Sequence, residues 1–225
     1  MQIKSLSYDP SKDFKFISKI YEGSTVVVTS TSRNWTSLRE AIAEAKKEPG
    51  RVAYASFGPG TPPQLLLETL AKVAGVKFTE VFYKGAAPAL QDLLTDRIAL
   101  SASGYTPYAS MVAAGKLTVI AVTGKRRMAI LPNVPTIAEQ GYEHFLMQYN
   151  AWAGVVGPAS LPQAIADQLV EAIRAAFREP KLAKFLTDNG LILVANSPAE
   201  FEREFRQEFE IVPKIMREDL HITPQ

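Results

Sequence analysis

Short apolar runs alternate with longer amphipathic stretches along the first half of the chain, and this order limits the fold more than any other feature. The runs are rich in β-branched residues and end at turn residues, so each predicts a buried strand. These strands cover residues 25–29, 52–56, 78–82, 98–102 and 117–122. The stretches between them predict helices over residues 35–47, 61–73, 88–94 and 105–114. This alternation is typical of an α/β fold with parallel strands and crossover helices, which brings the loops after residues 56, 82 and 102 to one edge of the sheet.

The composition changes after Val122, where a stretch rich in charged residues, Pro and Gly begins. Beyond it the sequence predicts a strand over residues 148–156, a long helix after Pro162, a short helix after Pro180 and a strand over residues 191–194. A last helix is expected to begin with Ser197 as its N-cap. Phe201, Phe205 and Phe209 recur at every fourth position of that helix, and this spacing predicts an apolar stripe that docks the helix on its domain.

The charge of the chain limits its partners. Its 225 residues include 25 Lys and Arg against 23 Asp and Glu, with 47% hydrophobic residues. This is the composition of a globular protein, and it lacks the basic stripe on which nucleic-acid binding depends. We interpret the basic cluster Lys125-Arg126-Arg127 as a solvated loop because no second cluster extends it. No nucleic-acid partner is therefore expected. The sequence also shows no membrane-spanning run and no targeting segment.

Patterns of catalytic and metal-binding residues are missing from the sequence. The absence of Cys excludes disulfides, thiol catalysis and thiolate metal sites. His144 and His221 lie away from the expected loop edge, so no nucleophile has a histidine base beside it. No His-Glu-x-x-His motif or pair of carboxylates at a motif spacing occurs, and we expect no metal and no other cofactor. An enzyme stays open only because a fold does not fix a function.

The most suggestive local chemistry is the segment from Ser56 to Thr61, which leaves a strand, makes a Gly-rich turn and enters a helix. The start of a helix suits an anion, because its N–H groups have no intrahelical partners and lie at the positive end of the helix dipole. The alternative is an ordinary turn with Thr61 as N-cap. The segment lacks the Gly-Lys-Ser/Thr of a P-loop and the spacing of a dinucleotide-binding motif, so nucleotide binding is disfavoured.

Two further loops fall on the same predicted edge. In the segment from Tyr83 to Pro88, Lys84 is either a counter-charge to an acidic ligand or a solvated lysine. The segment from Leu100 to Tyr105 supplies the hydroxyls of Ser101 and Ser103. Clefts beyond the carboxyl ends of strands are where open α/β sheets bind ligands, so three such loops together indicate a binding site.

The assembled segments resemble a known family, the periplasmic solute-binding proteins of tripartite tricarboxylate transporters, also called Bug or TctC-like receptors. The segments that carry the resemblance are YDPSKDF at 8–14, YASFGPGT at 54–61, YKGAAPALQDLL at 83–94, AAGKL at 113–117, AVT at 121–123, LPNVPTIAE at 131–139 and GPA at 157–159. Their order and spacing cover nearly the whole chain. One position departs from the family, because Gln64 stands where members commonly have His and so lacks a titratable ring.

The resemblance implies an α/β, periplasmic-binding-protein-like fold in which two lobes close on a small carboxylate-bearing solute through backbone amides and waters. It also implies a non-catalytic receptor that works in the periplasm with the membrane components of a transporter. Solute contacts carried over by motif fall at Ser56, Gly58, Gly60, Thr61, Gln64, Lys84, Gly85 and Ala86, with Ser101 and Ser103 as outer candidates. Trp152 either walls the cleft or packs at the hinge.

The resemblance also implies that the chain begins in the middle of the first lobe. We therefore expect residues 1–28 and 151–225 to form an incomplete first lobe and residues 29–150 an intact second lobe, with crossings near 28–30 and 150–152. An incomplete lobe leaves open a second interpretation, a non-transporting remnant that associates with another copy of itself as a homodimer through the unpaired sheet edge.

Overall fold

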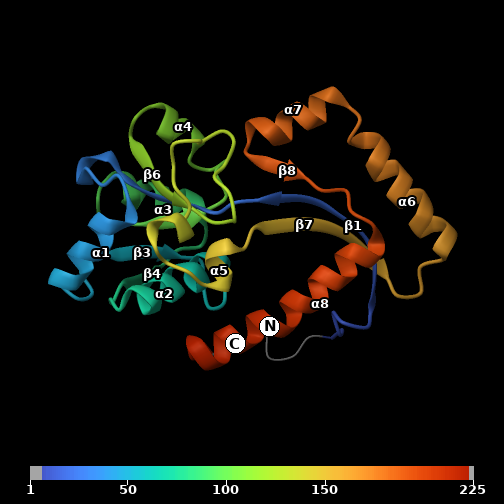
Figure 1. Cartoon of the computed structure of the whole chain (residues 1–225), viewed down its shortest axis with the longest axis horizontal. Coiled ribbons are helices and arrows are strands. Elements are labelled where there is room, and N and C mark those ends of the chain that lie inside the picture. Colours follow the sequence, from blue (N-terminus) through green and yellow to red (C-terminus); the bar gives the residue numbers. More distant parts are fainter. Residues whose placement is uncertain (1–6, 223–225) are drawn as a thin grey trace.

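The computed structural model describes residues 7–222 and consists of two α/β lobes side by side (Figure 1). The sheet of the first lobe has the strand order β7-β1-β8, with both outer strands antiparallel to the central one. Its strands are β1 (Phe14–Gly23), β7 (Ala151–Pro158) and β8 (Leu191–Leu193). Its helices are α6 (Gln163–Ala176), α7 (Pro180–Asp188) and α8 (Pro198–Lys214).

The second lobe holds the strand–helix alternation that the sequence predicts. Its strands are β2 (Val26–Ser30), β3 (Ala53–Ser56), β4 (Thr79–Phe82), β5 (Ser101–Ser103) and β6 (Leu117–Val122). Its helices are α1 (Leu38–Lys47), α2 (Pro62–Ala74), α3 (Ala86–Leu94), α4 (Ala109–Ala113) and α5 (Phe145–Gln148). Short 3-10 turns occur at Thr31–Arg33 and Ala138–Gln140. The predicted α/β class is confirmed.

The sheet of the second lobe is mixed, so the expectation of all-parallel strands is wrong. β3 and β4 are parallel, and an isolated parallel bridge between Tyr54 and Leu100 joins them to β5. β2 runs antiparallel to both β5 and β6. The carboxyl ends of β3, β4 and β5 nevertheless share one edge of the sheet, as expected. Because β2 enters from the opposite direction, its first residues lie at that same edge.

The segment from Phe78 to Phe82 is not the buried strand that its apolar character predicts. Phe78 is buried, but Thr79 and Glu80 are exposed and Phe82 has 63% of its surface accessible. The reason is that, among the described strands, β4 pairs only with β3 and forms the rim of the sheet.

Helix boundaries follow local capping chemistry. Ser197 caps α8 with a capping box, in which its hydroxyl accepts from the Glu200 N–H and the Glu200 carboxylate accepts from the Ser197 N–H. Ser37 and Glu40 make the same box at α1. At α2 the N-cap residue Thr61 makes no side-chain cap bond. Within residues 7–222 no helix combines the length and the apolar character that crossing a membrane requires.

The first lobe is built around aromatic side chains, as the phenylalanine stripe of the last helix predicts. Phe201 of α8 is 1% exposed and makes edge-on contacts with Phe16 of β1 and Trp152 of β7, with ring centroids 5.2 and 5.1 Å apart. Phe205 also contacts Phe16 and stacks on Phe209. Gly154 of β7 leaves room for Phe201, because a Cβ there would lie 2.4 Å from Phe201 Cζ. On the other face of the sheet, Ile17 packs against α6.

The end of the chain leaves the first lobe. Ile215 and Met216, in the π-helical turn Ile215–Asp219 that follows α8, pack with Leu65 of α2 and Leu146 of α5 in the second lobe. Lys72 Nζ lies 3.0 Å from Asp219 Oδ1. Residues 151–225 were expected to belong to the first lobe. Their last part packs on the second lobe instead, since α8 starts on the first lobe and its continuation finishes on the second (Figure 1). Residues 1–6 and 223–225 of the expected ranges lie outside the described residues.

Replacing Phe201 by Ala should lower the free energy of unfolding by about 3–5 kcal/mol, because it empties a close-packed aromatic site. Phe185→Ala on α7 is the matched control, since Phe185 is 60% exposed and its loss should cost about 0.5 kcal/mol or less. Denaturant unfolding of the two variants measures both values. An equal loss of unfolding free energy in the two variants would contradict the conclusion that the first lobe is packed around Phe201.

Candidate functional site

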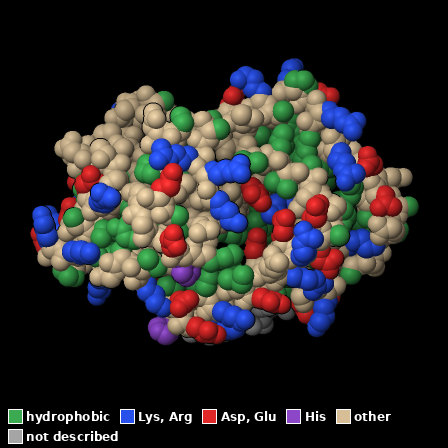
Figure 2. All heavy atoms as spheres, viewed as in Figure 1, with side chains coloured by type: hydrophobic (Ala, Val, Ile, Leu, Met, Phe, Trp, Pro, Cys, Tyr) green, Lys and Arg blue, Asp and Glu red, His purple; other side chains and the backbone are tan. Residues whose placement is uncertain are grey.

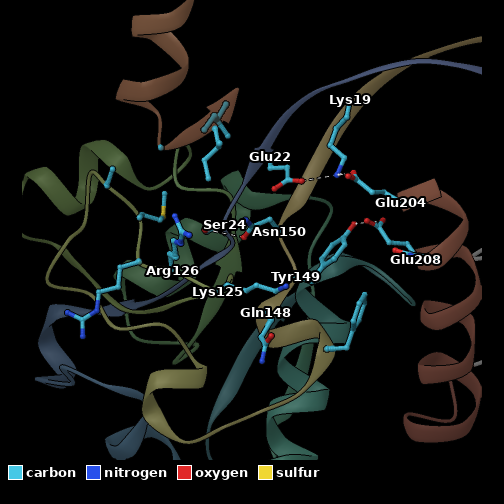
Figure 3. A pocket seen from close by; sticks show the side chains of 18 of the residues that line it. Lys19, Glu22, Ser24, Lys125, Arg126, Gln148, Tyr149, Asn150, Glu204 and Glu208 are labelled. Atoms are coloured by element: carbon cyan, nitrogen blue, oxygen red, sulfur yellow. Dashed lines mark hydrogen bonds and ion pairs between the residues drawn. The ribbon is translucent and has the colours of Figure 1, made fainter. Parts of the chain in front are cut away.

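A cleft of about 840 Å³ lies between the two lobes. Charged side chains from the first lobe and from the loop after β6 face into it, and the segments that cross between the lobes form its floor (Figure 3). The polar and charged lining residues are Lys19, Glu22, Ser24, Lys125, Arg126, Arg127, Gln148, Tyr149, Asn150, Thr187, Glu204, Gln207 and Glu208. The cleft is large enough for a small metabolite.

The wall from the first lobe contains a buried ion cluster. The Lys19 side chain is 4% exposed, and its Nζ contacts Glu22 Oε1 at 2.8 Å and Glu204 Oε2 at 2.5 Å. Burial alone would lower the pKa of Lys19, but the bonds to Glu204 and Glu22 outweigh it and hold that pKa above its usual value. Lys19 also lies 5.9 Å from the centroid of the Trp152 ring. Lys19 is therefore a charged residue whose ammonium group is paired with two carboxylates.

Glu208 of α8 connects the same wall by hydrogen bonds to the segment around residues 149–152, where the chain crosses between the lobes. Its Oε2 accepts from Trp152 Nε1 at 2.6 Å and from the Tyr149 hydroxyl at 3.1 Å. Burial raises the pKa of Glu208, and the bonds from Trp152 and Tyr149 only partly offset the effect. Burial and the nearby Glu208 carboxylate also raise the pKa of Tyr149. Trp152 packs on Phe201 and bonds to Glu208, a geometry that favours hinge packing over a role in lining the cleft.

The wall from the second lobe is basic. Lys125 and Arg126 are exposed at the cleft, while Arg127 Nε is 2.9 Å from Glu139 Oε2 and so is already paired. The interpretation of this cluster as only a solvated loop is therefore incomplete. The sequence signal for a place at the cleft was the position of this cluster directly after β6, because β6 ends at the same sheet edge as the predicted binding loops.

The crossings between lobes meet at the floor of the cleft. The first runs from Gly23 to Val26, earlier than the expected 28–30, because β2 pairs with β5 and β6 and so belongs wholly to the second lobe. The second lies at Asn150, within the expected 150–152. Ser24 Oγ donates to Asn150 Oδ1 at 3.3 Å and so links the two crossings.

Gly124 fits against this junction. It has a φ of +107°, its N–H donates to Met147 O at 2.9 Å, and a Cβ added to it would lie 2.7 Å from Asn150 Oδ1. Its neighbour Thr123 exchanges hydrogen bonds with Thr25: the Thr25 N–H donates to Thr123 Oγ1 and the Thr123 N–H to Thr25 O, both at 2.9 Å. The hinge is therefore a compact set of hydrogen bonds with no space for a side chain at position 124.

The predicted residues Ser56, Gly58, Gly60, Thr61 and Gln64 come together where β3 leads through a loop into the first turn of α2. Ser56 Oγ accepts from the Gly58 N–H, and Thr61 Oγ1 donates to Gly58 O. Gln64 Oε1 accepts from the Gly60 N–H at 2.7 Å. Many of the polar groups in this loop are thus engaged within it.

This loop reaches the hinge beside the main cleft. Gly60 and Pro62 line a smaller pocket of about 190 Å³ together with Tyr149, which also lines the main cleft. Pro62 and Pro63 occupy the first positions of α2 and have no N–H, so the helix start offers fewer donors than the expected anion site assumes. Gln64 Nε2 donates to Glu80 at 2.9 Å, a contact that the sequence did not indicate.

The other predicted residues are placed differently. Lys84, Gly85 and Ala86 follow β4 beside the first loop, where the Tyr83 N–H donates to Ser56 O at 2.8 Å. Lys84 is exposed, and Gly85 is the N-cap residue of α3. Ser101 is buried and shares a hydrogen bond of 2.7 Å with the Tyr108 hydroxyl, while Ser103 is partly exposed. Within residues 7–222 none of these side chains lines the main cleft, and no three His, Asp or Glu residues are grouped to hold a metal ion.

Comparison with known proteins decides the family. The sequence model of the "Tripartite tricarboxylate transporter family receptor" matches residues 1–218. The chain belongs to this receptor family. The resemblance seen in the sequence motifs is thereby confirmed, as is a fold of the periplasmic-binding-protein type. Members of this family are periplasmic solute-binding receptors.

Individual relatives agree with that assignment. A UPF0065 protein from the TAR-I ttuE-ttuC' intergenic region of Agrobacterium vitis is 30% identical over 217 residues, which are 95% of this chain and 62% of that protein. The chain therefore spans less than two thirds of that relative. The structure of R. palustris Rpa4515 with adipate has a TM-score of 0.88 and 26% identity, covering 99% of this chain and 74% of that one. The structure of the periplasmic binding protein BugD has a TM-score of 0.85 and 25% identity, and it also covers 99% of this chain and 74% of that one.

A series of three glycine variants tests the hinge. Gly124→Ala should lower the free energy of unfolding by about 2–4 kcal/mol, because it combines backbone strain at positive φ with crowding against Asn150. Gly115 has a φ of +66° with nothing within 4 Å of an added Cβ, so Gly115→Ala should cost only the strain, about 1 kcal/mol. Gly104→Ala lacks both features and should be nearly neutral. Denaturant unfolding gives the order, and equal effects at positions 124 and 115 would remove the steric argument.

Glu208→Gln tests the buried carboxylate through the pH dependence of unfolding. A raised pKa means that the folded protein takes up the proton more readily than the unfolded chain, so the native protein gains stability as pH falls through that pKa. The charged and polar groups facing Glu208 are Lys19, Glu204, Trp152 and Tyr149, with Glu22 close to Tyr149. From pH 7.5 to pH 5 the wild type should gain stability relative to Glu208→Gln. Glu210→Gln, at an exposed position of the same helix, should show no such trend.

Proposed function

We propose that the chain binds a small carboxylate-bearing solute in the cleft between its lobes and delivers it, in the periplasm, to the membrane components of a tripartite tricarboxylate-type transporter. The observation that carries this proposal is the basic wall of Lys125 and Arg126 on a two-lobe cleft with a double-crossing hinge. Membership of the receptor family and the adipate complex of R. palustris Rpa4515 support it. In this proposal the chain binds and releases its solute unchanged and is not an enzyme.

In the proposed mechanism the two sheets are the bodies that move. One lobe carries β1, β7 and β8 and the other carries β2 to β6, with the bend at Ser24 and Asn150. Closure would bring the first lobe towards the edge where the loops at Ser56 to Gln64 and at Lys84 to Ala86 end. Backbone N–H groups of these loops would then complete the hydrogen bonding of a carboxylate that the basic wall attracts.

Calorimetric titration of the purified chain with mono-, di- and tricarboxylates tests the proposal. At least one carboxylate should bind, and Arg126→Gln should weaken it about tenfold or more, because a charge-assisted hydrogen bond is lost. Arg39→Gln, at an exposed position on α1, is the matched control and should leave the affinity unchanged. Absence of binding by every carboxylate would contradict the proposed function.

A second candidate is self-association with another copy of the chain. The exposed large apolar side chains of the first lobe include Val156, Ile165, Leu169, Phe185 and Ile192. Figure 2 shows hydrophobic side chains gathered beside α7 on the face in view. Exposed apolar side chains that gather on one face favour a protein–protein contact. A stable dimer in light scattering, combined with no carboxylate binding, would favour this candidate over the receptor.

A further inference from the structure

We propose that His144 is a pH-sensitive switch, which holds the C-terminal turn Ile215–Asp219 on the second lobe at neutral pH and releases it in acid. This inference goes beyond the proposed function, because it concerns a link between the lobes and requires no solute. It follows from the packing of the turn, from the hydrogen bond that His144 makes, and from the position of α5 between the turn and the hinge.

The C-terminal turn makes an apolar contact between the lobes. It continues α8 of the first lobe, yet it packs on α2 and α5 of the second (Figure 1). Ile215 and Met216 are 6% and 3% exposed, and they contact Leu65 and Leu146. Burial of this apolar surface stabilises the attached state of the turn. The attachment therefore depends on where α5 places Leu146.

His144 fixes the start of α5 (Phe145–Gln148) and with it the backbone of Leu146. It is the N-cap residue of the helix, and its Nδ1 accepts from the Leu146 N–H at 3.2 Å. Only an unprotonated nitrogen accepts a hydrogen bond, so the neutral imidazole fits this position. In the imidazolium both ring nitrogens are donors, and the Leu146 N–H, which lies at a helix start, then loses its acceptor. Protonation of His144 therefore removes the cap beside the residue on which the turn is seated.

Charged groups face His144 from both elements packed against it. Asp219 of the turn favours the imidazolium and Lys72 of α2 opposes it, while His221 lies close to Asp219. Lys72 and Asp219 also pair with each other, but both side chains are about half exposed and such a pair contributes little. Burial has the largest effect and lowers the pKa of His144.

The direction of the pH effect follows from this lowered pKa. Release of the turn exposes the imidazole to water and returns its pKa towards the ordinary value of about 6.5. The released state then binds a proton more readily than the attached state, so the attachment is strongest above that value. It weakens as pH falls through about 6.5 towards the lower pKa of the attached state.

α5 also connects the switch to the hinge. Met147, two residues after the exposed Phe145, is buried in the core of the second lobe, and its C=O accepts from the Gly124 N–H at 2.9 Å. Gly124 directly precedes Lys125 and Arg126 of the basic cleft wall. Release of the C-terminal turn therefore removes a link between the lobes next to the segment that positions this wall.

Distances between pairs of spin labels test the switch in the solute-free chain. Because the chain has no Cys, labels attach only at introduced positions. One pair joins Arg217 of the turn to Lys46 of α1, both exposed. From pH 7.5 to pH 5 its population of long distances should rise about fivefold or more, the effect of losing a typical N-cap. A control pair at Lys46 and Lys116, both on the second lobe, should give the same distance at both pH values.

Three variants carrying the first label pair assign the response to His144. His144→Asn keeps a side-chain acceptor for the cap but does not titrate, so the turn should stay attached at pH 5. His144→Ala has no acceptor and should release the turn to a similar extent at both pH values. His221→Asn removes the other histidine, at an exposed position, and should respond to pH as the parent does. Thermal unfolding at each pH checks that every variant is folded.

Two outcomes would overturn the inference. One is a distance between Arg217 and Lys46 that does not change from pH 7.5 to pH 5. The other is a pH response that persists in His144→Asn, because another group would then control the turn. Either outcome leaves the carboxylate receptor standing, since no solute is present, and a failure to bind any carboxylate would leave the switch standing.

Discussion

The packing of Phe201 between Phe16 and Trp152 determines the geometry of everything around the cleft. It places the start of α8 on the sheet of the first lobe, and the next turns of that helix then carry Glu204 and Glu208 to the cleft wall. Beyond Pro213 the chain reaches the second lobe, where Met216 is buried. One helix with its continuation therefore links both lobes in addition to the two crossings. α8 and its continuation are thus anchored on Phe16 and Trp152 in the first lobe and on Leu65 and Leu146 in the second.

Charge burial gives the cleft its chemical character. Removing Lys19 from water is costly unless its charge is compensated, and two carboxylates compensate it at short distance. The same carboxylates leave the first wall with an excess of negative charge, opposite the positive charges of the loop after β6. In general, complementary charges at a binding surface contribute more to specificity than apolar area alone does.

Much of the fold was predictable because its elements are set by local patterns. The strand runs, the capping sequence at Ser197 and the spacing of Phe201, Phe205 and Phe209 each fix an element without information from elsewhere in the chain. Strand direction was not predictable in the same way, since a short apolar run such as that of β2 is compatible with either direction. The exposure of β4 depended on its place at the rim of the sheet, which no local pattern encodes.

The candidate site was only partly predictable for a related reason. The loop from Ser56 to Gln64 is a local motif, and sequence reasoning found it, although its internal hydrogen bonds depend on a partner as distant as Glu80. The cleft itself gathers residues from near positions 20, 125, 150 and 205, which no spacing rule connects. β1 carries three charged residues, Lys15, Lys19 and Glu22, and no local pattern distinguishes Lys19 and Glu22, which line the cleft, from Lys15.

The position of Trp152 has an optical consequence. The chain has two tryptophans, and Trp35 lies in the core of the second lobe with Arg33 over its ring. Trp152 instead sits at the second crossing, bonded to Glu208 and close to Lys19. Carboxylates and ammonium groups near an indole shift and quench its emission. The protein therefore carries one intrinsic fluorophore among charged groups beside the second crossing, and a second one in the core of the second lobe under the guanidinium of Arg33.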